Sequence, residues 1–201
     1  MSVRALLVAA LIAGSSSIAQ GQAREGAQVR LLVGPAYVHM GQDLNAGDEL
    51  GAAGLGYAAQ LAIGAMVTDA LAINTELAYA RSDAAEHDVL GETSATALFA
   101  GVGATYWLLE ADVYFAGSIG ATRSSIEGAP LRVQIEVPQS DASEVGFGAQ
   151  LSVGKTFEVS RRFGLGAALS LGWATASNPV SGVDSHRRAL TALLALAAAI
   201  G

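Results

Sequence analysis

The chain has 201 residues, 52% of them hydrophobic and 14% charged, and it carries a formal net charge of −7. This acidic balance argues against nucleic acid as a partner, because phosphate binding needs clustered Lys and Arg. The chain has no cysteine, which excludes disulfide bonds and a lipid-modified N-terminus. None of its apolar runs reaches the length of a membrane-spanning helix. Hydrophobicity that is high but interrupted favours a membrane barrel, in which lipid-facing and inward residues alternate.

Residues 1–23 have the parts of a secretory signal peptide. Residues 1–4 are a short basic start, and residues 5–13 are apolar but too short to span a bilayer. Small residues follow, and they permit cleavage after Ala19 or Ala23. We therefore expect one mature domain over residues 24–201.

Eight segments alternate between apolar and small or polar residues with the period of two that a half-buried strand requires. In chain order they cover residues 28–40, 55–67, 71–81, 96–107, 113–123, 145–157, 163–176 and 188–200. The fourth and fifth are less regular, and the eighth is rich enough in Ala and Leu to resemble a short helix. In the sixth and seventh, aromatic residues stand ten positions apart. Ten residues rise roughly 33 Å, which at the usual barrel tilt projects to about 25 Å, the height of an outer-membrane apolar band.

The connections alternate in length. Three are short, around residues 68–69, 108–112 and 158–162, and four are long and polar: residues 41–54, 82–92, 124–143 and 177–187. Short periplasmic turns and long extracellular loops are typical of outer-membrane barrels. The alternation is consistent for all eight strands if the N-terminus lies in the periplasm.

The five Tyr, five Phe and two Trp are predicted to form two girdles at the membrane–water interfaces. The loop-side girdle is Tyr37, Tyr57, Tyr79, Phe99, Phe147 and Trp173. The turn-side girdle is Tyr106, Trp107, Tyr114, Phe115, Phe157 and Phe163.

From about Arg24 to Gly201 the chain resembles the small eight-stranded outer-membrane barrels of the OmpA and OmpX type. The resemblance is one of architecture across the whole mature chain, without a signature motif. It implies a closed, all-β, eight-stranded antiparallel transmembrane barrel, monomeric and located in the outer membrane. The chain departs from many such barrels at its last residues, Ala199-Ile200-Gly201, where they carry a phenylalanine that the assembly machinery reads.

Several polar residues share the inward parity of their strands. They are Arg30, Gln60, Asn74, Glu76 and Gln150. A buried charge needs a partner, so Arg30 and Glu76 are predicted to belong to one polar network that plugs the lumen. A narrow ion path is the alternative, but eight strands leave an interior just wide enough for side chains.

Three arginines, Arg81, Arg123 and Arg188, are predicted at strand–loop junctions with lipid-facing parity. Guanidinium geometry suits the phosphates of lipopolysaccharide, which we therefore expect as a partner. The first two long loops are acidic and contain no Lys or Arg; they are either solvated or bridged to the same lipids by divalent cations. The extracellular loops are also the candidate surface for an external partner.

Motifs for chemistry are weak in this chain. Gly154-Lys155-Thr156 ends like a P-loop, but it lacks the glycine five positions earlier and keeps strand alternation, so Lys155 is predicted to snorkel at the periplasmic rim. His39, His87 and His186 fall on the loop side, where some enzymes that modify lipid A place a Ser/His/acid group, but no local motif supports such a site. We therefore predict no catalytic, cofactor or metal site.

The expected role is structural or surface-interactive, in envelope integrity or adhesion. The alternatives are a lipid A-modifying hydrolase or acyltransferase, a narrow channel, and a soluble lipocalin-like periplasmic binder whose apolar face would point inward.

Overall fold

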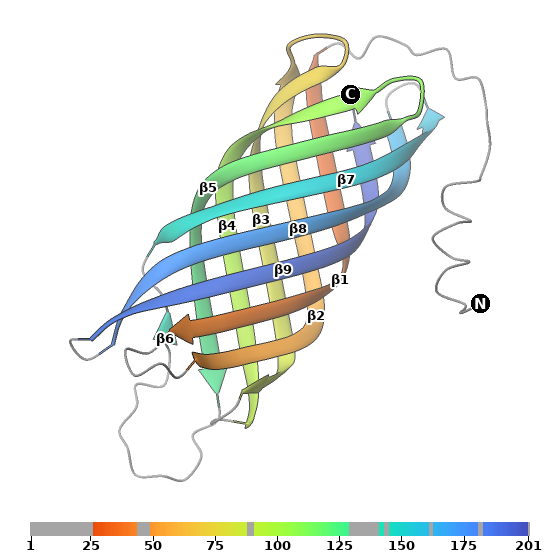
Figure 1. Ribbon diagram of the computed structural model, residues 1–201. Helices are drawn as coiled ribbons and strands as arrows, with labels where there is room; N and C mark the ends of the chain where they lie inside the picture. The colour runs from red at the N-terminus through yellow and green to blue at the C-terminus, as the bar shows by residue number, and fades with distance from the viewer. Residues whose placement is uncertain are drawn as a thin grey trace.

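The computed structural model describes residues 26–43, 49–87, 91–128, 141–142, 145–160, 163–180 and 183–200. It is a closed barrel of eight long antiparallel strands (Figure 1). The strands are β1 (Ala27–Asp43), β2 (Glu49–Met66), β3 (Leu71–His87), β4 (Gly91–Leu108), β5 (Val113–Gly128), β7 (Gly146–Ser160), β8 (Phe163–Val180) and β9 (Val183–Ile200), with a two-residue β6 (Asp141–Ala142) beside β5. The predicted signal peptide, residues 1–23, lies outside the described residues. No helix in the described part of the chain is long and apolar enough to cross a membrane.

The barrel closes between its first and last strands. Each long strand pairs with the next long strand along the chain, so that β5 pairs with β7, and β1 pairs with β9 from Val29 opposite Ile200 to Asp43 opposite His186. The Ala- and Leu-rich last segment is therefore a strand, as the alternation predicts. Closure leaves no long strand with an edge facing hydrocarbon, where an unpaired backbone group costs several kcal/mol.

Tight turns join the strands at the end where β1 begins and β9 ends, which is the upper end in Figure 1. In the β2–β3 turn, the amides of Val67 and Thr68 donate to the carbonyl of Leu71, and the Thr68 hydroxyl accepts from the amides of Ala70 and Leu71. In the β4–β5 turn, Asp112 has φ 54°, a left-handed conformation that Asp tolerates better than most residues. The two predicted short turns that the structure describes in full are thus confirmed.

Large apolar side chains cover the outside of the barrel. Leu151, Leu169 and Leu194 are 68%, 46% and 61% exposed, and every long strand has large apolar side chains that are exposed in the same way. A soluble protein does not expose an apolar surface that continues around its whole circumference. The prediction that the apolar face points outward is confirmed, and a lipocalin-like barrel with its apolar face inside is excluded.

The strands are longer than predicted, and the long loops are correspondingly shorter. The long strands have 15 to 18 residues, although about 9 to 11 residues cross a membrane. Most residues of three of the four segments predicted as loops therefore continue the strands, and the links between described strands there shrink to residues 44–48, 88–90 and 181–182; the fourth segment keeps residues 129–140 between β5 and β6. Alternation fails to reveal these extensions because neither face of a strand touches lipid once it leaves the membrane.

Three of the predicted girdle aromatics point into the barrel instead. Phe99, Trp107 and Tyr114 are 8%, 1% and 0% exposed, whereas the other aromatics stand on the outer face. Glycines on the inner face make room for these rings: a Cβ at Gly154 would collide with the Tyr114 ring, and a Cβ at Gly101 would collide with Phe99. The lumen is thus filled by large rings as well as by small residues.

Candidate functional site

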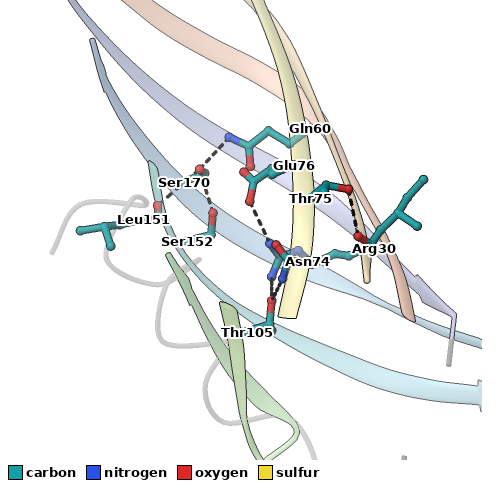
Figure 2. A network of polar contacts seen from close by, with 10 residues as sticks. Arg30, Gln60, Asn74, Thr75, Glu76, Thr105, Leu151, Ser152 and Ser170 are labelled. Carbon is teal, nitrogen blue, oxygen red and sulfur yellow. Dashed lines mark hydrogen bonds and ion pairs between the residues drawn. The ribbon is translucent and has the colours of Figure 1, made fainter. Parts of the chain in front are cut away.

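The turn-side half of the lumen contains a buried ion pair. Arg30 Nη2 lies 3.6 Å from Glu76 Oε2, and each side chain is 3% exposed (Figure 2). Arg30 Nη1 also donates to Thr105 Oγ1 at 3.2 Å, and the guanidinium carbon lies 4.7 Å from the centroid of the Tyr114 ring. Asn74 Nδ2 donates to the same Thr105 oxygen at 2.9 Å. This cluster ties together β1, β3, β4 and β5 across the interior.

A second, neutral cluster lies beside the ion pair. Gln60 Nε2 donates to Ser170 Oγ at 2.7 Å, and Ser152 Oγ donates to the same oxygen at 2.9 Å (Figure 2). The Ser170 hydroxyl in turn donates to the carbonyl of Leu151 at 3.4 Å. The cluster therefore joins β2, β7 and β8, and Gln150 is buried with it, 8% exposed.

Together the two clusters and the inward rings occupy much of the lumen. The Trp107 and Tyr114 rings pack with their centroids 4.9 Å apart, and both are almost completely buried. All five residues predicted to face the lumen do so: Arg30, Gln60, Asn74, Glu76 and Gln150 are each at most 8% exposed. The structure places Arg30 against Glu76, as the parity argument expects, while Gln60 forms its hydrogen bond with Ser170 instead.

Thr105, Ser152, Ser170 and the inward rings are cluster members that the sequence prediction missed. Adjacent residues of a strand point to opposite faces, so Trp107 and Tyr106 cannot both face lipid. The same holds for Tyr114 and Phe115. Strict parity would have identified one ring of each pair as internal.

The three predicted lipid-contact arginines lie on the outer face, just beyond the loop-side aromatics. Arg81 is in register with Tyr57, Arg123 with Leu98, and Arg188 with Thr175. Their predicted position at strand ends is wrong, because β3, β5 and β9 each extend at least five residues farther from the membrane. Strand pairing continues there because the backbone groups of water-exposed hairpins still gain hydrogen bonds. Arg81 and Arg123 differ in their partners, since Arg81 Nε donates to the carboxylate of Asp83.

The candidate catalytic groups are dispersed over the loop side. His39 lies on the outer face of β1, in register with Ala53 and Leu190, while His87 is on β3 and His186 on β9. Among the described residues, no three His, Asp or Glu side chains are grouped as metal ligands would be. Lys155 is in the middle of a strand segment, not in a loop that enters a helix, and its Nζ lies 5.4 Å from the Phe157 ring centroid. The P-loop reading is therefore excluded by context.

Comparison with known proteins gives the fold and no family. No protein-family model matches the chain, and no curated protein matches it. Among solved structures, Neisserial surface protein A is similar with a TM-score of 0.50 and 14% identity, over 87% of this chain and 96% of that one. The outer-membrane protein AlkL, solved by solid-state NMR in lipid bilayers, is similar with a TM-score of 0.52 and 14% identity, over 92% and 94% of the two chains.

These likenesses agree with what the exterior requires. A closed antiparallel barrel with an apolar band between two aromatic girdles satisfies every backbone group in hydrocarbon, and this design is that of outer-membrane proteins. The chain is therefore a small eight-stranded outer-membrane β-barrel, and the outer membrane is its location.

Proposed function

We propose that the protein is a non-conducting, non-catalytic barrel that acts at the cell surface, in envelope integrity or adhesion. The observation that supports this role is the length of the strands beyond the loop-side girdle. β3 continues from Tyr79 to His87, and β8 continues from Trp173 to Val180. On the turn side, by contrast, β4 ends two residues after Tyr106.

The extension is large compared with the membrane. A strand of 18 residues rises about 60 Å, which at the usual tilt projects to about 45 Å, whereas the apolar band is about 25 Å tall. The sheet therefore carries a raised wall about 20 Å beyond the membrane. A paired, tilted wall presents fixed side chains to the outside, and this favours a surface that contacts other molecules over one that only connects strands.

The contents of the lumen argue against conduction. The Arg30–Glu76 pair, the Gln60 cluster and the Trp107–Tyr114 rings all occupy the interior. A permeating ion would have to displace a paired buried charge, which is strongly unfavourable. The histidines, which were the basis of the enzyme alternative, come from separate strands.

We further propose lipopolysaccharide as the lipid partner of the loop-side rim. Arg123 and Arg188 are exposed on the outer face, where a guanidinium group can bind phosphate oxygens with two hydrogen bonds. Arg81 contributes less than Arg123, because the Asp83 carboxylate already occupies the Nε of Arg81. The neighbouring Tyr57 and Trp173 rings fix the depth of the barrel at this interface.

The proposal is tested by shortening the wall without touching the membrane-spanning part. Replacing residues 84–92 with a two-residue Asn-Gly turn should leave heat-modifiable gel migration intact and reduce detergent resistance or adhesion of cells that depend on the protein. The control variant keeps all nine positions but changes them to Ser and Gly. It shows whether an effect comes from the length of the wall or from its side chains. Full activity of the shortened variant in both cell assays would contradict a surface role.

The competing functions have separate readouts. The purified barrel in planar bilayers should show no discrete conductance steps, and regular steps would favour the narrow channel. The mass spectrum of lipid A should be the same in cells with and without the protein, and a defined mass change would favour the enzyme.

A further inference from the structure

A cavity lies inside the barrel on the loop side of the two glutamines. Its volume is about 30 Å³. Six of its fifteen lining residues are alanines, which come from five strands, and the Phe99 ring and two threonines also line it. The alanines of the wall are Ala58, Ala78, Ala80, Ala97, Ala174 and Ala189. Small residues on facing strands thus leave a space that a Leu or Val at any of these positions would fill.

Two side-chain amides line this space from opposite walls. Gln60 comes from β2 and Gln150 from β7, with three long strands between them in either direction around the barrel. They are 6% and 8% exposed, so neither amide is solvated from outside. Because Ser170 accepts the hydrogen bond from Gln60 Nε2, the orientation of that amide is set. The Oε1 atoms of both glutamines have no hydrogen-bond partner among the described residues.

The chemistry of the wall selects the ligand. Two acceptor oxygens require a donor, and a buried acceptor without one is costly. No described side chain that lines the cavity is charged, and the Arg30–Glu76 ion pair is not among the lining residues. An ion would therefore find no counter-charge, whereas a neutral hydroxyl could donate to an amide oxygen and rest its remaining surface on alanine methyl groups.

The volume limits the size of that ligand. A water molecule needs roughly 10–15 Å³ of such space, so the cavity takes two waters or one short alcohol. We propose that this cavity is a binding site for small neutral hydroxyl donors, held by Gln60 Oε1 and Gln150 Oε1. The site is independent of the surface role proposed above, since its lining residues lie inside the barrel.

NMR spectroscopy of the folded barrel in detergent micelles tests the site, with the side-chain amides of glutamine and the methyl groups of alanine labelled. Without additive, the Gln60 amide protons should show cross-peaks to water. Ethanol should then shift the Gln60 and Gln150 amides and the Ala58 and Ala174 methyl groups along one saturable curve. Ala100, on the lipid-facing side, is the internal control and should shift linearly, as for unspecific partitioning.

Two variants separate a hydroxyl site from a mere void. Gln150→Met keeps the volume but removes one acceptor, and it should weaken ethanol binding roughly tenfold, in line with the loss of one hydrogen bond to a buried group. Ala174→Leu should abolish saturable binding by filling the space, and Ala97→Val serves the same purpose if the larger side chain prevents folding.

The outcomes distinguish the two sources of the hydroxyl. Loss of the water cross-peaks as ethanol saturates means that either ligand occupies the same site, and persistence of those cross-peaks with no saturable ethanol shift identifies water as the occupant. Absence of water cross-peaks together with saturable binding of xenon would overturn the proposal, because the cavity would then be dry and apolar. Ethanol binding that is unchanged in Gln150→Met would overturn it as well.

Discussion

Replacing Arg30 with Met removes the cation of the Arg30–Glu76 pair while keeping a side chain of similar length. Glu76 then remains 2% exposed inside a membrane protein without the cation that it pairs with in the wild type. The variant also lacks the hydrogen bond of 3.2 Å from Arg30 to Thr105 and the contact of the guanidinium group with the Tyr114 ring. Removing one partner of a buried pair typically costs 3–5 kcal/mol, so we expect Arg30→Met to lower the free energy of unfolding by about 4 kcal/mol.

A double variant that removes both charges tests the reason for this loss of stability. In Arg30→Met/Glu76→Leu both charges are gone, and an apolar pair of similar volume occupies their space. Because desolvating the two ions offsets most of their attraction, the double variant should recover much of the lost stability and come within about 1–2 kcal/mol of the wild type. Arg123→Met is the matched control: the same change at an exposed arginine should cost at most about 1 kcal/mol.

The assay is urea unfolding of barrels folded into lipid vesicles, followed by tryptophan fluorescence and by heat-modifiable gel migration. Equal, small losses in Arg30→Met and Arg123→Met would refute the reasoning, because the buried pair would then be worth no more than a surface charge. A double variant as unstable as Arg30→Met would refute the role of the uncompensated Glu76 charge specifically.

Two further predictions concern the inner and the outer face of the barrel sheet. Gly154→Ala should destabilise the barrel by about 1–3 kcal/mol, because the new Cβ meets the Tyr114 ring, while Gly172→Ala should be nearly neutral since its nearest neighbour would be 3.6 Å away. Equal urea midpoints for the two variants would contradict this packing. Leu194→Arg, in the apolar band, should cost about 2–4 kcal/mol, whereas Ser125→Arg, beyond the loop-side girdle, should cost about 1 kcal/mol or less in the same vesicles. Equal losses of stability in the two variants would contradict the prediction that Leu194 faces lipid.

The part of the candidate site that could be predicted is the part for which it was enough to know that a residue is charged and that it faces the lumen. Arg30 and Glu76 are the charged residues of their strands with inward parity, and a buried charge requires an opposite one, so their pairing followed from the sequence. Thr105 and Ser170 were not predictable as the shared acceptors. Each receives donors from two other strands, and the sequence does not state which levels of those strands coincide in the lumen.

The sequence by itself determined the number of membrane-crossing strands, the closed barrel and its outward apolar face. Alternation records the solvent on each side of a strand, and lipid on one side with a crowded lumen on the other gives the strongest contrast a chain can encode. Only the tertiary structure decided how far the strands continue outside the membrane, where both faces meet water and the contrast vanishes. It also decided that Trp107 and Tyr114 turn inward, because their places depend on the space left by glycines such as Gly154 on neighbouring strands.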